Sequence, residues 1–121
     1  MTTPDPTRER RLHVRVRPAV DYELRISLVD GVMRTPLLVV DISLGGVGLL
    51  LDEMTEKLNV KDTLQLHLSP PVGSAFECEA SVRHISKATS VVGIRWQNLS
   101  KEHGTTLDRV VSELLTRGNM A

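Results

Sequence analysis

The sequence predicts a mainly β protein, a six-stranded antiparallel β-barrel followed by a C-terminal α-helix. Six short apolar segments, several of them alternating between apolar and polar residues, are separated by turn signals. After Leu99 the period changes, and the apolar residues take the spacing of a helix: Leu107, Val110, Val111, Leu114 and Leu115. Short strands punctuated by turns and ended by one amphipathic helix are typical of a small barrel with a helical lid.

The N-terminal region divides into two parts. Residues 1–9 contain two prolines and three threonines and little that could be buried, which predicts a disordered lead-in. Residues 10–17 form a flexible basic arm, with Leu12, Val14 and Val16 as light anchors. The globular domain, with this arm included, is expected to span residues 10–117.

The first half of the barrel is predicted from three segments. Val20–Leu28 alternates strictly between apolar and polar residues, as a half-buried strand does. Asp30-Gly31 is a hairpin signal, and the turn could extend to Thr35-Pro36. The next strands are predicted at Leu37–Ile42 and Val47–Leu51.

The second half repeats the alternation. Residues 52–59 indicate a loop or one helical turn, and Thr63–Leu68 places its leucines on one face. The segment from Phe76 has Phe76, Cys78, Ala80 and Val82 in the inward phase, which His84 would continue as a core histidine. In the last strand, Val92, Ile94 and Trp96 point inward and Arg95 outward.

The closing helix is predicted at about residues 101–117. Ser100 is a suitable N-cap, and Glu102 is favourable in the first turn, near the positive end of the helix dipole. Gly118 is a natural terminator.

Composition restricts the classes of function. The 121 residues suit one domain, and Lys+Arg equals Asp+Glu at 15 each, so the overall charge does not indicate a nucleic-acid polymer or an anionic membrane as partner. Cys78 is the only cysteine, which excludes an internal disulfide and a cysteine-rich zinc site. The sequence shows no signal-peptide pattern and no apolar run of the ~20 residues that span a bilayer. A cytoplasmic protein without membrane insertion is expected.

Two stretches depart from what a barrel alone requires. Residues 8–17 hold five arginines and one glutamate. Residues 39–50, VVDISLGGVGLL, place Asp41, Ser43 and three glycines between apolar ends. Asp41 and Ser43 lie two apart, so in an extended chain both side chains leave the same face. The glycines permit positive φ and close approach to the backbone, so a carboxylate, a hydroxyl and bare backbone would form half of a binding site.

Arg11-x-x-x-Arg15 and Asp41-x-Ser43-x-x-Gly46 together resemble the PilZ domain, the bacterial receptor module for cyclic di-GMP. The order and separation of the two motifs also fit that family, and the resemblance extends from about Arg8 to Leu115. The family's barrel with a C-terminal helix agrees with the periodicity. The resemblance implies a cyclic di-GMP receptor with no cofactor beyond this ligand.

The resemblance assigns roles to individual residues. Arg11 and Arg15 would hold guanine and phosphate, and the barrel side would present Asp41, Ser43, Gly45 and Gly46. This agrees with their chemistry, since arginine pairs with phosphate oxygens or guanine O6/N7 and a carboxylate accepts from guanine N–H groups. Arg10, directly before the first motif arginine, implies two stacked ligand molecules. Arg95 and Arg83 face outward and could add phosphate contacts, although exposed strand arginines are more often solubilising.

Other interpretations stay open. A PilZ-like scaffold could recognise only a protein partner, and the receptor itself would signal to an unidentified downstream protein by a change in its arm; a homodimer is also open. Asp41 and Ser43 could serve only to form the turn. The four histidines, His13, His67, His84 and His103, lack metal-ligand spacing, and no nucleophile motif is present, so the protein is not expected to be an enzyme.

Overall fold

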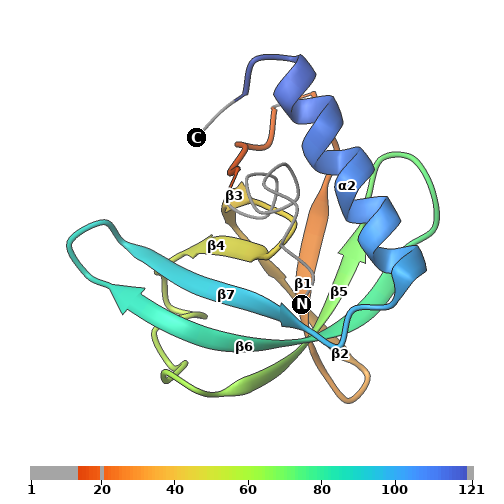
Figure 1. Cartoon of the computed structure of the whole chain (residues 1–121). Coiled ribbons are helices and arrows are strands. Elements are labelled where there is room, and N and C mark those ends of the chain that lie inside the picture. The colour runs from red at the N-terminus through yellow and green to blue at the C-terminus, as the bar shows by residue number, and fades with distance from the viewer. Residues whose placement is uncertain (1–13, 20, 120–121) are drawn as a thin grey trace, which may run out of the picture.

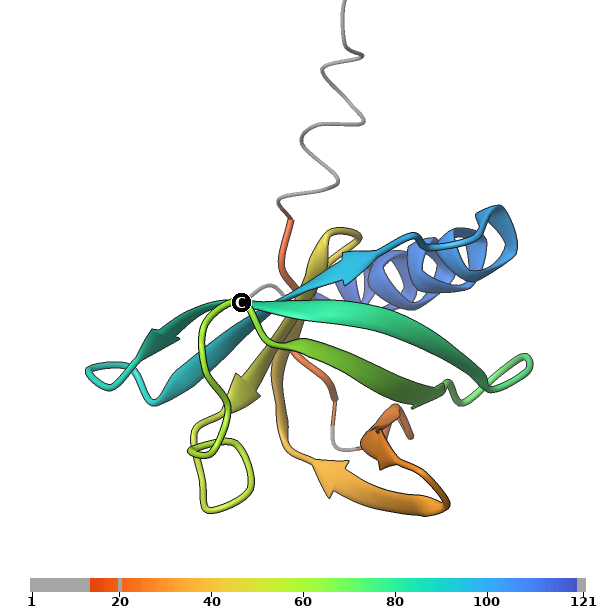
Figure 2. The same ribbon diagram turned by 90° about the horizontal axis from the view of Figure 1, so that it is seen from below.

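The protein is described by a computed structural model, which covers residues 14–19 and 21–119. Within that part, one antiparallel sheet has the strand order β2-β1-β5-β6-β7-β4-β3, and it curls around the core (Figures 1 and 2). The elements are β1 (Arg25–Asp30), β2 (Met33–Leu37), β3 (Val39–Ile42), β4 (Gly46–Leu50), β5 (Thr63–Ser69), β6 (Phe76–Ser86), β7 (Val91–Gln97) and α2 (Lys101–Thr116). The prediction of a mainly β domain with one C-terminal helix is confirmed.

The predicted closed six-stranded barrel is wrong, because the described residues form an open sheet of seven strands. The additional strand is β2, whose residues 33–36 were expected to lie between two strands, where the turn could extend to Thr35-Pro36. Only Leu37 of the predicted strand Leu37–Ile42 belongs to β2, and a break at Leu38 separates it from β3. The residues before Leu38 pair with β1 as β2, and those after it pair with β4 as β3. Consecutive segments therefore become the two edges of the sheet, and the carbonyl of Leu38 accepts a hydrogen bond from the Leu50 amide at 2.9 Å.

The first strand begins later than predicted. β1 starts at Arg25, whereas the alternation suggested a start at residue 20. The preceding residues turn instead, with the Tyr22 amide bonded to the Ala19 carbonyl at 3.0 Å. Tyr22 is buried against the helix side of the molecule, and its hydroxyl donates to Glu113 Oε2 at 2.6 Å.

The core lies between the inner face of the sheet and α2. The inward phases predicted for β5, for β6 as far as Val82 and for β7 are confirmed, because every apolar residue assigned to them is buried. Helix α2 adds four buried residues, while Leu115 is 41% exposed despite its place in the predicted apolar stripe. The most fully buried aliphatic side chains are Val16, Ile26, Ile42, Val47, Leu49, Leu66, Leu68, Val82, Val92, Leu107 and Leu114.

One inward assignment fails in the second half of β6. The register shifts between Val82 and His84, where a β-bulge interrupts the pairing with β7. Arg83 and His84 are consequently both exposed. The prediction of a core histidine at residue 84 is therefore wrong, because a bulge inserts one residue and reverses the phase of the side chains that follow.

The predicted helix boundaries are close to those observed. Ser100 is the N-cap, and its hydroxyl accepts from the His103 amide at 3.2 Å. Gly118 follows the helix with φ +77°, a conformation that glycine adopts without a Cβ penalty. Beyond it, the carbonyl of Asn119 accepts from the Arg17 amide at 2.7 Å. The end of the helical region is thereby tied to the segment that precedes β1.

Candidate functional site

The last residues of the predicted basic arm are attached to the edge of the sheet. Val16 forms an antiparallel bridge with Ile42 of β3, with two backbone hydrogen bonds of 2.9 Å. The Val16 side chain is completely buried. An apolar anchor and a pair of backbone bonds thus fix the position of the residue before it, Arg15, beside the C-terminal end of β3.

Arg15 and Asp41 form an ion pair across 26 residues of sequence. Arg15 Nη1 donates to Asp41 Oδ1 at 2.5 Å. The Arg15 side chain is 41% exposed and that of Asp41 is 16% exposed, so the pair faces solvent. The structure therefore brings together one residue from each of the two motifs.

Gly48 determines where the Asp41 carboxylate can lie. The two residues are paired across β3 and β4, and a Cβ built on Gly48 would stand 2.7 Å from Asp41 Oδ1. Only a residue without a side chain lets the carboxylate rest on the neighbouring strand. The sequence indicates backbone freedom and close approach at this glycine, but Gly48 was not among the predicted site residues. The signal was the alternation of β4, in which Gly48 occupies an outward position.

The Ser43 hydroxyl forms its hydrogen bonds within the turn between β3 and β4. The residue is 2% exposed. The hydroxyl accepts from the amides of Gly45 and Gly46, each at 3.2 Å, and it lies 3.4 Å from the Gly46 carbonyl. Asp41 and Ser43 do not share an exposed face, because β3 ends at Ile42 and the period-2 alternation ends with it.

Gly45 and Gly46 belong to the contact between this turn and β7. A Cβ on Gly46 would overlap the carbonyl oxygen of Ile94, which is backbone and cannot move aside easily. The Gly45 carbonyl accepts from the Trp96 amide at 3.0 Å, and the Trp96 indole Nε1 donates to the Ser43 carbonyl at 3.2 Å. Glycine at residue 46 is thus required by strand packing.

The arginines considered as further contacts have different positions. Arg95 is exposed on β7, where its Cα partners are Gly46 and Ser81. It therefore lies on the strand next to the 43–46 turn. Arg83 is exposed on the bulge of β6. Arg10 and Arg11 lie outside the described residues.

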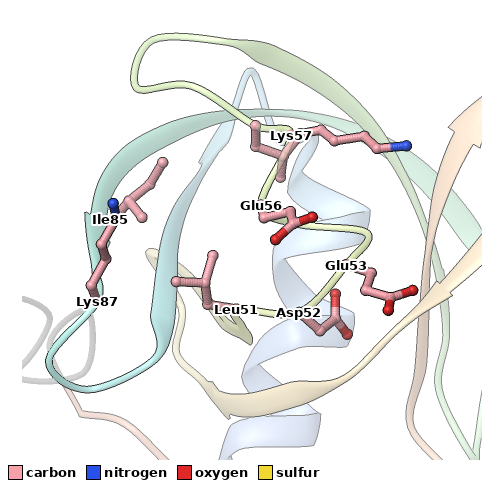
Figure 3. Close-up of a pocket in the computed structure, with 8 residues that line it drawn as sticks. Leu51, Asp52, Glu53, Glu56, Lys57, Ile85 and Lys87 are labelled. Atoms are coloured by element: carbon pink, nitrogen blue, oxygen red, sulfur yellow. The ribbon is translucent and has the colours of Figure 1, made fainter.

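A hollow of about 700 Å³ lies elsewhere, beside the turns that follow β4 (Figure 3). Leu51, Leu58 and Ile85 supply its apolar lining. None of the predicted site residues that the structure describes contributes to it. Its charged lining residues are Asp52, Glu53, Glu56, Lys57 and Lys87.

The described part of the chain holds neither a metal-ligand cluster nor a membrane-spanning helix. No group of three or more His, Cys, Asp or Glu residues there is arranged to hold a metal ion. Among the same residues, no helix has the length and apolar character needed to cross a membrane.

The arrangement of a basic N-terminal segment against the end of β3 agrees with comparison to known families. The PilZ domain model matches residues 9–113. The chain belongs to the PilZ domain family. No curated protein matches this PilZ domain in sequence.

Solved structures share the fold of this PilZ domain at low sequence identity. The PilZ domain of Escherichia coli YcgR, solved with c-di-GMP, is 18% identical with a TM-score of 0.65, covering 86% of this chain and 90% of that one. The K. pneumonia MrkH–c-di-GMP complex is 12% identical with a TM-score of 0.67, covering 86% and 51%. Bacillus subtilis MotI, named an inhibitor of motility, is 16% identical with a TM-score of 0.64, covering 86% and 50%. The chain thus spans about half the length of MrkH and MotI.

Proposed function

We propose that this PilZ domain is a receptor for cyclic di-GMP, with the basic arm and the edge of β3 forming the ligand site. The main observation that supports this proposal is the Arg15–Asp41 ion pair at 2.5 Å. The Arg15 guanidinium can donate to phosphate oxygens and to guanine O6/N7, and the neighbouring Asp41 carboxylate can accept from guanine N–H groups. Support also comes from the family and from the c-di-GMP named in the YcgR and MrkH structures.

The ion pair leaves binding capacity on both partners. The bond between them uses Arg15 Nη1 and Asp41 Oδ1. A guanidinium has five N–H donors, and a carboxylate accepts at both oxygens. Arg15 could therefore contact a phosphate or a guanine while it still orients Asp41, and Asp41 Oδ2 could accept from a guanine amine. The proposed site is in this sense pre-organised rather than blocked.

The proposed roles of the remaining candidate residues are divided between direct contact and support. Arg10 and Arg11 would extend the basic surface from Arg15, and Arg95 would reach the same edge from β7. Ser43, Gly45 and Gly46 would shape the turn that supports Asp41. Signalling to a partner protein would follow from a change in the arm, whose base is bonded to both β3 and the residues after α2.

Titration calorimetry with cyclic di-GMP tests the proposed function. Arg15→Ala and Asp41→Ala should each lose about 10- to 150-fold in affinity, because a hydrogen bond to a charged group contributes roughly 1.5–3 kcal/mol. Arg34→Ala is a matched control, since Arg34 is an exposed arginine on β2 that is paired with Glu77 at 3.7 Å. It should bind as the wild type does.

The outcomes separate the candidate roles. Absence of binding by the wild type would refute the receptor function, and unchanged binding by both site variants would refute the site. The stoichiometry of the wild-type titration tests the stacked pair of ligands, which predicts two nucleotides per chain.

A further inference from the structure

The outer face of the sheet carries a row of four residues that begins at Asp41. Asp41 of β3 pairs with Gly48 of β4, Gly48 pairs with Gly93 of β7, and Gly93 pairs with His84 of β6. Gly93 lies on the outer face, because the residues on either side of it, Val92 and Ile94, are in the core. Two paired glycines therefore occupy the middle of the row, with a polar side chain at each end.

Both polar side chains lie over the glycines. The Asp41 carboxylate rests on Gly48, as described above. A Cβ built on Gly93 would overlap Cε1, Nδ1 and Nε2 of the His84 imidazole at nearly equal distances. Near-equal distances to three ring atoms require the ring to present its face, not its edge, to Gly93. One face of the imidazole thus covers the strand, and His84 is exposed on its other side.

Several features that weaken a sheet coincide in this row. Glycine inside a strand costs roughly 0.5–1 kcal/mol relative to alanine, and it marks places where another group approaches the backbone. The bulge between Val82 and His84 is the feature that turns His84 outward. Bulges often re-aim a side chain next to a functional site.

We propose that His84 is a stacking platform for a guanine base of the dinucleotide, on the same face as Arg15 and Asp41. This inference rests on the proposed receptor function. A flat ring lying on the sheet offers a π-face to a base, and bases stack on such faces whatever their hydrogen-bonding edges. Arg95 lies on the adjacent outward position of β7, so the platform is bordered by cationic as well as acidic groups.

Replacement of His84 tests the platform by titration calorimetry with cyclic di-GMP. His84→Ala should weaken binding about 5- to 150-fold, which is the range measured for the loss of one base–aromatic stack. His84→Phe should keep most of the wild-type affinity, because it retains a flat ring. His84→Gln, which retains a hydrogen-bonding group but no ring, should behave as the alanine variant does.

Gly93→Ala provides a second test that leaves the histidine in place. Its φ is not in the left-handed region, so the backbone accepts alanine, but the new Cβ would displace the imidazole. Affinity should fall as it does in His84→Ala. In the double variant the two losses should not add, because both act on the same ring.

Proton NMR of the wild type supplies a measurement that needs no variant to fold. Titration with cyclic di-GMP should move the His84 ring resonances through the ring current of a stacked base. The ring signals of His103, which is stacked on Phe76 at 4.1 Å, should stay in place.

The outcomes keep the two proposals apart. A wild type that does not bind would overturn both. Binding that is lost in Arg15→Ala but unchanged in His84→Ala and Gly93→Ala, with unmoved His84 resonances, would overturn the platform alone. Retained affinity in His84→Gln but not in His84→Phe would also overturn it, since a hydrogen bond would then replace stacking.

Discussion

The residues of the motif around the β3–β4 turn divide into one partly exposed charge and a set of structural residues. The Asp41 side chain is 16% exposed beside Arg15, while Ser43 is buried and bonded within the turn. The motif predicted that Asp41 and Ser43 belong to one site, and the alternation of an extended strand predicted that both side chains leave the same face. The alternation could not reveal that the strand ends at Ile42, because the turn conformation depends on the contact of Gly46 with β7.

Two glycines of this turn and strand should respond differently to alanine. Gly46→Ala should destabilise the fold by about 1–3 kcal/mol, since its Cβ would meet the Ile94 carbonyl in the backbone of β7. Gly48→Ala meets only the Asp41 carboxylate, at 2.7 Å, and a side chain can rotate. It should cost less stability but weaken cyclic di-GMP binding by moving Asp41. Urea unfolding and calorimetry of both variants measure the contrast, and equal stability losses would contradict it.

Among the elements, the segment before β1 links β3 to the region around α2. Val16 was predicted as an anchor, and its complete burial confirms this. The partner of the anchor, Ile42, could not be predicted, because a single bridge between residues 26 apart leaves no periodic pattern. The same segment carries Tyr22, whose hydroxyl bonds to Glu113 of α2. The alternation instead assigned Tyr22 to a strand.

The Tyr22–Glu113 bond should stabilise the docking of α2. Tyr22→Phe should lower the free energy of unfolding by about 1.5–3 kcal/mol, because the part-buried Glu113 would lose a hydrogen-bond donor. Asp21→Asn is the control: it removes the Asp21–Arg117 ion pair at 3.0 Å, whose aspartate is 78% exposed. Exposed pairs contribute about 0–1 kcal/mol. Urea unfolding of both variants measures the two losses in the free energy of unfolding. A larger loss in Asp21→Asn than in Tyr22→Phe would contradict the prediction.

At the scale of the whole molecule, the fold class could be predicted from periodicity, but the closure of the sheet could not. β2 contains Arg34, Thr35 and Pro36, which favour a turn over a strand, so the sequence indicated only one strand here, from Leu37 to Ile42. The interruption falls at Leu38, which is 59% exposed and has nothing in its residue type to mark a break. Its cause is tertiary, because the chain there leaves its pairing with β1 and begins to pair with β4.

Cys78 is buried in the core, and its burial should make the stability of the whole domain fall as the pH rises into the alkaline range. Burial raises the pKa of the Cys78 thiol to about 11, from an ordinary value of 9.0. The unfolded chain releases the thiol proton near pH 9, while the folded chain keeps it to about pH 11. The free energy of unfolding is therefore unaffected by the ionisation of this thiol below pH 9. Between pH 9 and 11 the free energy of unfolding should fall by about 1.4 kcal/mol per pH unit, because only the unfolded chain has released the proton.

Urea unfolding under reducing conditions at pH 8, 9, 10 and 11 measures this dependence. Cys78→Ala should be less stable than the wild type at pH 8, because it loses buried sulfur, yet its stability should fall less steeply between pH 9 and 11. Part of the fall should remain, since burial and the bond to Glu113 also raise the pKa of Tyr22, which stays protonated in the folded state after the unfolded chain has ionised. Parallel pH profiles for the two proteins would mean that the thiol ionises equally in the folded and unfolded states, and that the core does not exclude its charged form.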